Sequence, residues 1–185
     1  MKSTLPNGSL KAITDCYISI PRYKKIYMYI LPDISDSKSA QYSDEAIIGR
    51  SSPFKTYSHS ENRTISWTAY FMTTHDNPNR DGSAIMNLRN LRAIQSVTYP
   101  RDKPAPYAPP PVCSIKCGSI LGNEELCVVL RSYTVKFPTD VSWDEETLLP
   151  YKFSVDMSWD VVYQSDQLPG WANIIDPDGW WNINN

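Results

Sequence analysis

Apolar and polar residues alternate almost without interruption near the C-terminal end of the chain. Apolar residues occupy every odd position from Tyr151 to Tyr163, and Val162 is the single apolar residue at the even positions between them. A period of two places successive side chains on opposite faces of a β-strand, so this stretch predicts a strand with one buried face. At ~3.3 Å per residue the strand would run roughly 40 Å, about twice the usual length. Such a strand favours a structural or assembling β-protein over a compact enzyme.

Several shorter stretches show strand patterns of the same kind. The clearest begins at Arg63, where Ile65, Trp67, Ala69 and Phe71 share one face. The other predicted strands are Tyr17–Ile20, Ile26–Leu31, Val112–Cys117 and Leu126–Phe137. The first half of the last of these is apolar on both faces, which indicates a sheet that is covered on both sides. The patterns together predict a mainly antiparallel β-sandwich or barrel, in a single domain that spans residues 1–165.

One segment changes from a period of two to helical spacing. From Ala84 onward apolar residues recur every three or four positions, which predicts an amphipathic helix over about residues 82–97. Asp81 or Ser83 can cap its first turn. The helix should end shortly before Pro100, because proline disfavours helical geometry in the residue that precedes it. This single helix would flank the sheet.

The segment from residue 33 to residue 61 is long and polar. It predicts a large loop with a short β segment inside, because charged and turn-forming residues dominate it. Loops of this length in a compact domain are usually functional or disordered. We therefore expect an inter-subunit contact element, with Arg50, Phe54 and Arg63 near its anchored ends.

Residues 166–185 form a C-terminal extension rich in tryptophan. Trp171, Trp180 and Trp181 stand among polar, glycine and proline residues, where large apolar side chains need something to pack against. They could fold back onto their own domain, dock on a neighbouring subunit as interface anchors, or form a platform on which sugars stack. Because proline and glycine breaks prevent a regular strand here, we expect an extended arm that leaves the domain and docks on a neighbour.

Composition and charge exclude several functional classes. The 185 residues carry a formal net charge of −2, so no basic surface for gripping nucleic acid is expected. No apolar run approaches the ~20 residues that a membrane helix needs. The first residues also lack the apolar core of a signal peptide. We therefore expect synthesis in the cytoplasm and no membrane partner, while 12 tyrosines and 6 tryptophans suit sheet surfaces and protein interfaces.

The sequence carries no recognisable catalytic or metal-binding motif. Nucleophile-elbow, phosphate-loop and zinc-protease patterns are absent. Cys113 and Cys117 would share one face of a strand but lie too far apart for an easy disulfide, so small buried side chains are the better interpretation. Asp156 and Asp160 share the polar face of the last strand, which exposure to solvent explains without catalysis. We expect no enzymatic activity, no metal and no cofactor.

Four stretches carry a family resemblance when they are taken in order. A polar loop precedes I-I-G-R-S-S-P-F and a strand that begins N-R-T-I, and a helix ends in L-R-A-I followed by Y-P. Prolines then introduce the strand V-C-S-I-K-C, and the long final strand follows L-P-Y. In this combination, over about residues 30–163, the chain resembles the tube-forming baseplate proteins of contractile-tailed bacteriophages, the tail-tube initiator or baseplate hub class.

The resemblance implies a tail-tube-like β-sandwich or barrel with one flanking helix, assembled as a homo-oligomeric ring that is six-fold in the tube family. It implies a structural virion protein of the baseplate or tail tube, assembled in the host cytoplasm. Its partners would be other baseplate hub and tail tube proteins and the tape measure protein. DNA would pass through the ring without specific binding, along a channel that Asp156 and Asp160 could line. The resemblance implies no enzyme and no cofactor.

A different functional class fits the residue patterns as a second interpretation. A jelly-roll binding module, such as a carbohydrate-binding domain, would stack sugar on the C-terminal tryptophans, and an enzyme comes third. The mass of the species in solution separates the first two interpretations, because a ring protein should assemble and a small binding module should not.

Overall fold

A computed structural model describes residues 12–49, 51–74, 80–100, 108–122, 124–145 and 150–163, together with residues 148 and 168. These residues form strands and one helix, whose bounds follow in chain order. They are β1 (Ile13–Ser19), β2 (Ile26–Met28), β3 (Asp33–Ser37), β4 (Ala40–Glu45), β5 (Phe54–Ser60), β6 (Thr64–Met72), α1 (Ala84–Ser96), β7 (Cys113–Cys117), β8 (Leu126–Lys136) and β9 (Lys152–Val161).

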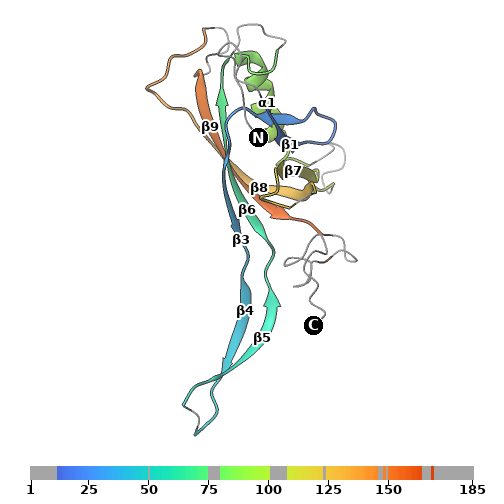
Figure 1. The fold of residues 1–185 in the computed structure, drawn as a ribbon, viewed down its shortest axis with the longest axis vertical. Coiled ribbons are helices and arrows are strands. Elements are labelled where there is room, and N and C mark those ends of the chain that lie inside the picture. Colours follow the sequence, from blue (N-terminus) through green and yellow to red (C-terminus); the bar gives the residue numbers. More distant parts are fainter. Residues whose placement is uncertain are drawn as a thin grey trace.

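Seven of the strands form one sheet in the order β2-β1-β7-β8-β9-β6-β3, and every neighbouring pair is antiparallel. β4 and β5 form a separate two-stranded sheet, which Figure 1 shows projecting far from the rest of the domain. These features confirm a mainly antiparallel β fold with one flanking helix. Within the described residues the large sheet ends at β2 on one side and at β3 on the other, so it does not close into a barrel.

The core lies on one face of the seven-stranded sheet. Along β9 the odd positions from Phe153 to Val161 are buried and the even positions between them are half exposed, as the period of two predicts. The strand is ten residues long, shorter at both ends than the predicted one. β6 pairs with β9 over nine residues and brings Trp67 and Trp159 into the same core. Both indoles are fully buried, so the pairing of these two strands defines the centre of the domain.

The helix forms where helical spacing predicts it. Ser83 is its N-cap, because its side chain accepts a hydrogen bond from the backbone N–H of Met86 at 3.2 Å. Asp81, the other predicted cap, instead forms an ion pair with Lys24. Leu91 is buried in the same core cluster as the sheet residues. α1 therefore covers part of the buried face of the sheet, and its charged residues point away from that face.

An irregularity in β8 changes which of its positions face the core. Val128 and Leu130 are buried, and the register with β9 then shifts between Leu130 and Ser132. A bulge of this kind adds one residue to a strand and reverses which positions face inward. Tyr133 and Val135 therefore pack against the core as well. The expectation that both faces of this strand are covered is wrong, because Cys127, on the outward face of its first half, is exposed.

The segment predicted as a large loop, residues 33–61, is mostly β-structure. β3 pairs with β6 inside the sheet, and β4 and β5 continue the same two chain segments beyond it. All residues of β4 and β5 are exposed. A ribbon with two exposed faces needs no alternation of apolar and polar residues, so its strands give no period-two signal. We call residues 40–60, from the start of β4 to the end of β5, the arm.

Candidate assembly interface

The arm stands clear of the core. Its strands pair antiparallel from Ala40 opposite Ser60 to Glu45 opposite Phe54, and Figure 1 shows them leading away from the large sheet. An isolated two-stranded hairpin is marginally stable in water, because it has no hydrophobic layer of its own. Contact with another molecule would supply that layer. The arm is therefore the first candidate for a functional surface.

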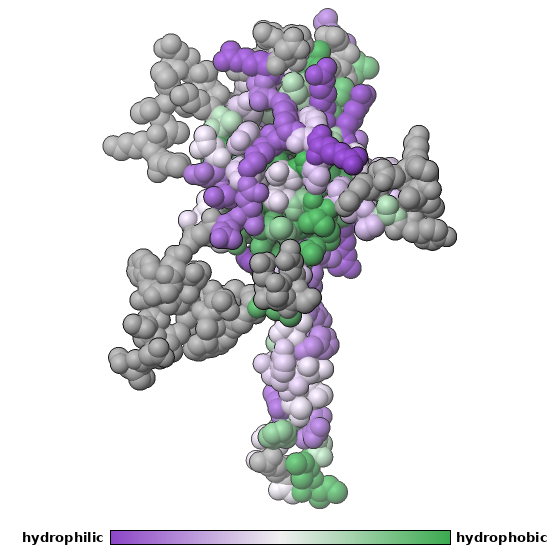
Figure 2. Space-filling model, turned by 90° about the vertical axis from the view of Figure 1, so that its right-hand side faces the viewer, coloured by the Kyte–Doolittle hydropathy of each residue, from purple (hydrophilic) through white to green (hydrophobic). Residues whose placement is uncertain are grey.

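Apolar side chains gather at the free end of the arm. Ile48 is completely exposed, and Ile47 and Phe54 each expose about half of their surface. Figure 2 shows them as a hydrophobic patch at the far end of a mostly polar arm. Exposed apolar residues that cluster in one patch mark interaction sites more often than scattered ones do. The sequence signal that could have identified this tip is the pair of isoleucines inside an otherwise polar segment.

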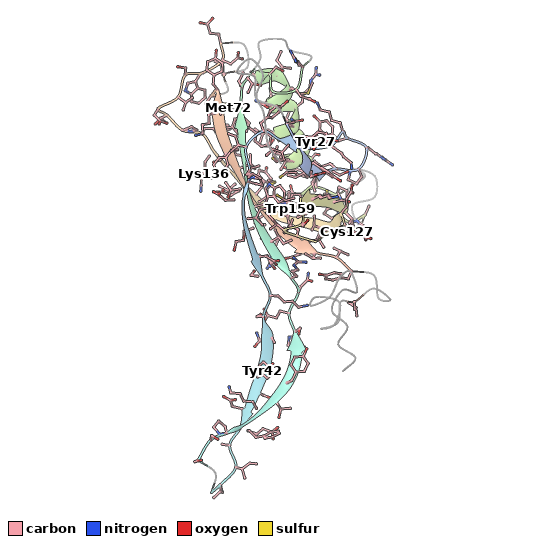
Figure 3. The ribbon with its side chains drawn as sticks, in the orientation of Figure 1. Tyr27, Tyr42, Met72, Cys127, Lys136 and Trp159 are labelled. Atoms are coloured by element: carbon pink, nitrogen blue, oxygen red, sulfur yellow. The ribbon has the colours of Figure 1, made fainter. Side chains whose placement is uncertain are left out.

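Cross-strand pairs hold the register of the arm. Tyr42 and Tyr57 lie opposite each other with ring centroids 5.7 Å apart in an edge-to-face arrangement, and Figure 3 labels Tyr42 on the arm. Next to them, Lys55 Nζ lies 3.1 Å from Asp44 Oδ1. Pairs of these kinds contribute roughly 0.2–1 kcal/mol each. They still leave both tyrosine rings more than half exposed, so the rings are available to a partner.

Polar contacts fix the base of the arm. Arg63 Nε donates to the two carboxylate oxygens of Asp36 at 2.9 and 3.1 Å, and its Nη2 donates to Oδ2 at 2.6 Å. These bonds raise the pKa of the Arg63 guanidinium. Glu61 accepts hydrogen bonds from Ser39 Oγ and Gln41 Nε2, each at 2.6 Å, and they lower the pKa of its carboxyl. Charge-assisted bonds of this geometry are strong and directional, so they define the angle at which the arm leaves the sheet.

The structure places two of the predicted interface residues on or beside the arm. Phe54 lies at the tip and is half exposed, so its predicted place near an anchored end of the segment is wrong. Arg63 lies at the base, where its own chain engages it through Asp36 and where its side chain is 18% exposed. The remaining predicted interface residues fall outside the described residues, as does the predicted C-terminal extension apart from residue 168. They are Arg50, Trp171, Trp180 and Trp181.

The sheet face opposite the core is polar. Asp156 Oδ2 lies 2.6 Å from Lys136 Nζ, and its Oδ1 accepts a hydrogen bond from Thr68 Oγ1 at 2.8 Å. These contacts, that of Lys136 first, lower the pKa of the Asp156 carboxyl. Asp160 Oδ1 accepts a hydrogen bond from Thr64 Oγ1 at 3.2 Å. The two carboxylates predicted to line a channel therefore share one face, and Lys136 balances the charge of one of them.

Metal-binding groups and reactive thiols were sought among the described residues. No group of three or more His, Cys, Asp or Glu side chains among them could hold a metal ion. Cys16 and Cys117 are paired across β1 and β7 as buried free thiols, with their Sγ atoms 3.3 Å apart. Burial raises the pKa of the Cys16 thiol far above its ordinary value, which keeps it protonated and unreactive.

The part of the chain that the structure describes contains no helix that could cross a membrane. Its single helix, α1, is neither long enough nor apolar enough to cross a bilayer.

Comparisons with known proteins show a similarity among solved structures and none among families or curated proteins. No protein-family model matches this chain, and no curated protein matches it. Among solved structures, the chain is similar to a chain from the virion of a native gene transfer agent particle, with 10% sequence identity and a TM-score of 0.38. The similarity covers 86% of this chain and 100% of that one. Because a TM-score this low assigns neither fold nor function, we argue the function from the surfaces described above.

Proposed function

We propose that this chain is a structural virion protein of a phage-like particle, a subunit of a ring in the baseplate or tail tube of a contractile tail. Copies would form a homo-oligomeric ring, six-fold by resemblance to the tube family, that joins hub proteins to the tube. The observation that carries the proposal is the arm. It extends far beyond its own core and ends in apolar side chains, which docking on another subunit would explain.

Docking would bury the tip of the arm in the neighbouring subunit. Complete burial of an isoleucine side chain contributes about 1.5–3 kcal/mol, and Ile48 starts from full exposure. The tyrosine pair of Tyr42 and Tyr57 adds further area along the same arm. Since the base of the arm is already braced by Arg63 and Glu61, less conformational freedom is lost on docking. The arm would thus act as a pre-formed clamp between subunits.

The polar sheet face would line the channel of the ring. It carries hydroxyl groups from Thr64 and Thr68 beside the carboxylates of Asp156 and Asp160. With a net charge of −2, the chain has no positive excess with which to bind a phosphate backbone. DNA would therefore pass without being gripped, and short duplexes should show no measurable affinity at ~0.15 M salt.

A substitution at the tip tests the role of the arm. Ile48→Asp places a charge where the proposed interface is apolar, and Ser51→Asp introduces the same charge in the same exposed turn as a matched control. Both variants should keep the circular dichroism spectrum and thermal stability of the wild-type chain, because neither residue touches the core. The Ile48 variant should lose self-association in sedimentation and incorporation into particles, whereas the Ser51 variant should keep both.

Two outcomes would contradict the proposal. An Ile48→Asp chain that assembles as well as the wild type would show that the tip is not an assembly contact. A chain that stays a small defined species and binds polysaccharide instead would favour the carbohydrate-binding interpretation. In that case deletion of residues 166–185, which carry the three C-terminal tryptophans, should abolish sugar binding.

A further inference from the structure

Three arginines surround a groove on the flank formed by the β1–β2 turn and α1. Arg22 comes from the turn, and Arg89 and Arg92 come from the helix. They line a hollow of about 400 Å³ whose walls include Tyr23. A second hollow of about 500 Å³ shares Arg22 and extends the groove to Tyr99. We call this feature the arginine groove.

Among the described residues, no carboxylate is paired with the positive charge of the arginine groove. None of its three guanidinium groups forms an ion pair in the described part of the structure. The nearby carboxylate of Asp81 is paired with Lys24. Arg22 also adopts a left-handed backbone conformation, with φ of 64°, which is uncommon for a residue with a side chain. Three unpaired guanidinium groups around a hollow form a site for carboxylates, which such groups bind with strong, directional hydrogen bonds.

The loop between β8 and β9 carries the opposite charge. Its residues 138–145 include Asp140, Asp144 and Glu145, and no lysine, arginine or histidine. We call residues 138–145 the acidic loop. In Figure 1 the loop after β8 projects to the left of the sheet, while β1 and α1 lie to the right. The acidic loop and the arginine groove therefore lie on different flanks of one subunit.

The acidic loop presents an aromatic side chain on a fixed backbone. Trp143 is 46% exposed. Its backbone bridges to Pro150, and the N–H of Tyr151 donates to the carbonyl oxygen of Ser142 at 2.9 Å. Burying an aromatic ring that is already held in place costs little conformational entropy. Tryptophan is also the aromatic residue that guanidinium groups contact most favourably.

We propose that the acidic loop of one copy docks in the arginine groove of the next copy. Asp140 and Glu145 would pair with the guanidinium groups, and Trp143 would enter the hollow as the anchor. Because the loop and the groove are different surfaces on different flanks, the contact is head-to-tail, and it closes into a ring when the rotation between copies allows. This contact is separate from the arm, and it rests on the proposed function in requiring that copies of the chain assemble.

A charge swap tests the contact in the full-length chain. The groove variant carries Arg89→Glu with Arg92→Glu, and the loop variant carries Asp140→Lys with Glu145→Lys. Each variant alone places like charges against each other, so its self-association should weaken about tenfold or more in sedimentation. A 1:1 mixture should restore association, because the reversed groove then meets the reversed loop while the two unchanged surfaces also meet. Such a rescue requires that the loop of one copy contacts the groove of another.

A control and three outcomes complete the test. Arg131→Glu with Lys152→Glu changes the net charge as the groove variant does, at exposed positions on other strands, and should associate like the wild type. If either swap variant self-associates as strongly as the wild-type chain, the contact is overturned. It is also overturned if the 1:1 mixture does not recover association although both variants keep their circular dichroism spectra. A wild-type chain that stays monomeric also overturns it. Loss of association in Ile48→Asp but not in the groove variant would leave the arm proposal standing and remove this one.

Discussion

The ion pair at the base of the arm allows a quantitative prediction. Arg63 and Asp36 make three contacts between 2.6 and 3.1 Å, with side chains that are 18% and 40% exposed. A fully exposed ion pair contributes about 0.2–1 kcal/mol. Hydrogen bonds to charged groups contribute about 1.5–3 kcal/mol when they are protected from water. Because Asp36 is partly in water, we expect a coupling free energy between these limits, about 1–2 kcal/mol.

A double-mutant cycle measures this coupling. Arg63→Met and Asp36→Asn are made singly and together, and each free energy of unfolding comes from denaturant titration. In a domain of this size 1 kcal/mol corresponds to about 2–4 °C in Tm, so the effect is well within reach of thermal unfolding. Lys55 and Asp44 on the arm provide the matched control. Their side chains are 67% and 53% exposed, so their coupling should be below about 0.5 kcal/mol.

Two results would refute the reasoning. A coupling free energy close to zero for Arg63 with Asp36 would show that this pair stabilises the fold no more than a fully exposed ion pair does. A coupling for Lys55 with Asp44 of the same size would show that exposure does not decide the difference. If the pair of Arg63 with Asp36 holds the base of the arm, Arg63→Met should also speed hydrogen exchange there. The exchange of β9 should stay slow, since β9 lies in the core.

Three further predictions concern the core and its surroundings. Leu91→Ala should lower the free energy of unfolding by about 2–5 kcal/mol, because Leu91 is 4% exposed. Leu88 is half exposed, so Leu88→Ala should cost less. An equal loss of stability in both variants would contradict the packing of α1. A thiol reagent should label the exposed Cys127 quickly and the other three cysteines only after unfolding, whereas rapid labelling of all four would show that the core is open. The lowered pKa of Asp156 means that its stabilisation is complete above the ordinary value of 3.8 and is lost as pH falls through the lower folded value. Lys136→Met should therefore flatten the loss of stability between about pH 5 and pH 2, measured by urea titration, and an unchanged slope would rule out this linkage.

Local sequence patterns predicted the helix and most strands of the large sheet, but not β3, which lies in the segment predicted as a loop. Phe153 and Trp67 lie in strands that bury one face, and burial of one face requires apolar residues at every second position. Ser83 caps the helix through a bond to a residue three positions away, so a short window of sequence contains the whole interaction. Elements whose stabilisation is local, or whose burial is regular, can be recognised from the amino-acid sequence alone.

Other elements depended on pairing between distant segments. The arm was predicted as a loop because both of its faces meet solvent, and no periodicity marks such strands. The bulge between Leu130 and Ser132 arises from the register that β8 adopts against β9. Without that register, the sequence does not show that the inward positions of β8 change from even to odd numbers along the strand. Periodicity reports burial, and it carries no information on which strand lies beside which.

The surfaces proposed for assembly could be identified only from the tertiary structure. Arg63 and Asp36 lie 27 residues apart in the chain and meet because β3 pairs with β6. Arg22 joins Arg89 and Arg92 because α1 lies beside the β1–β2 turn. The sequence by itself determined the residue types, the charge, the helix and those strands that bury one face regularly. Which charged groups meet, and which apolar groups stay exposed, was decided by burial and pairing over long distances in the chain, which no local pattern records.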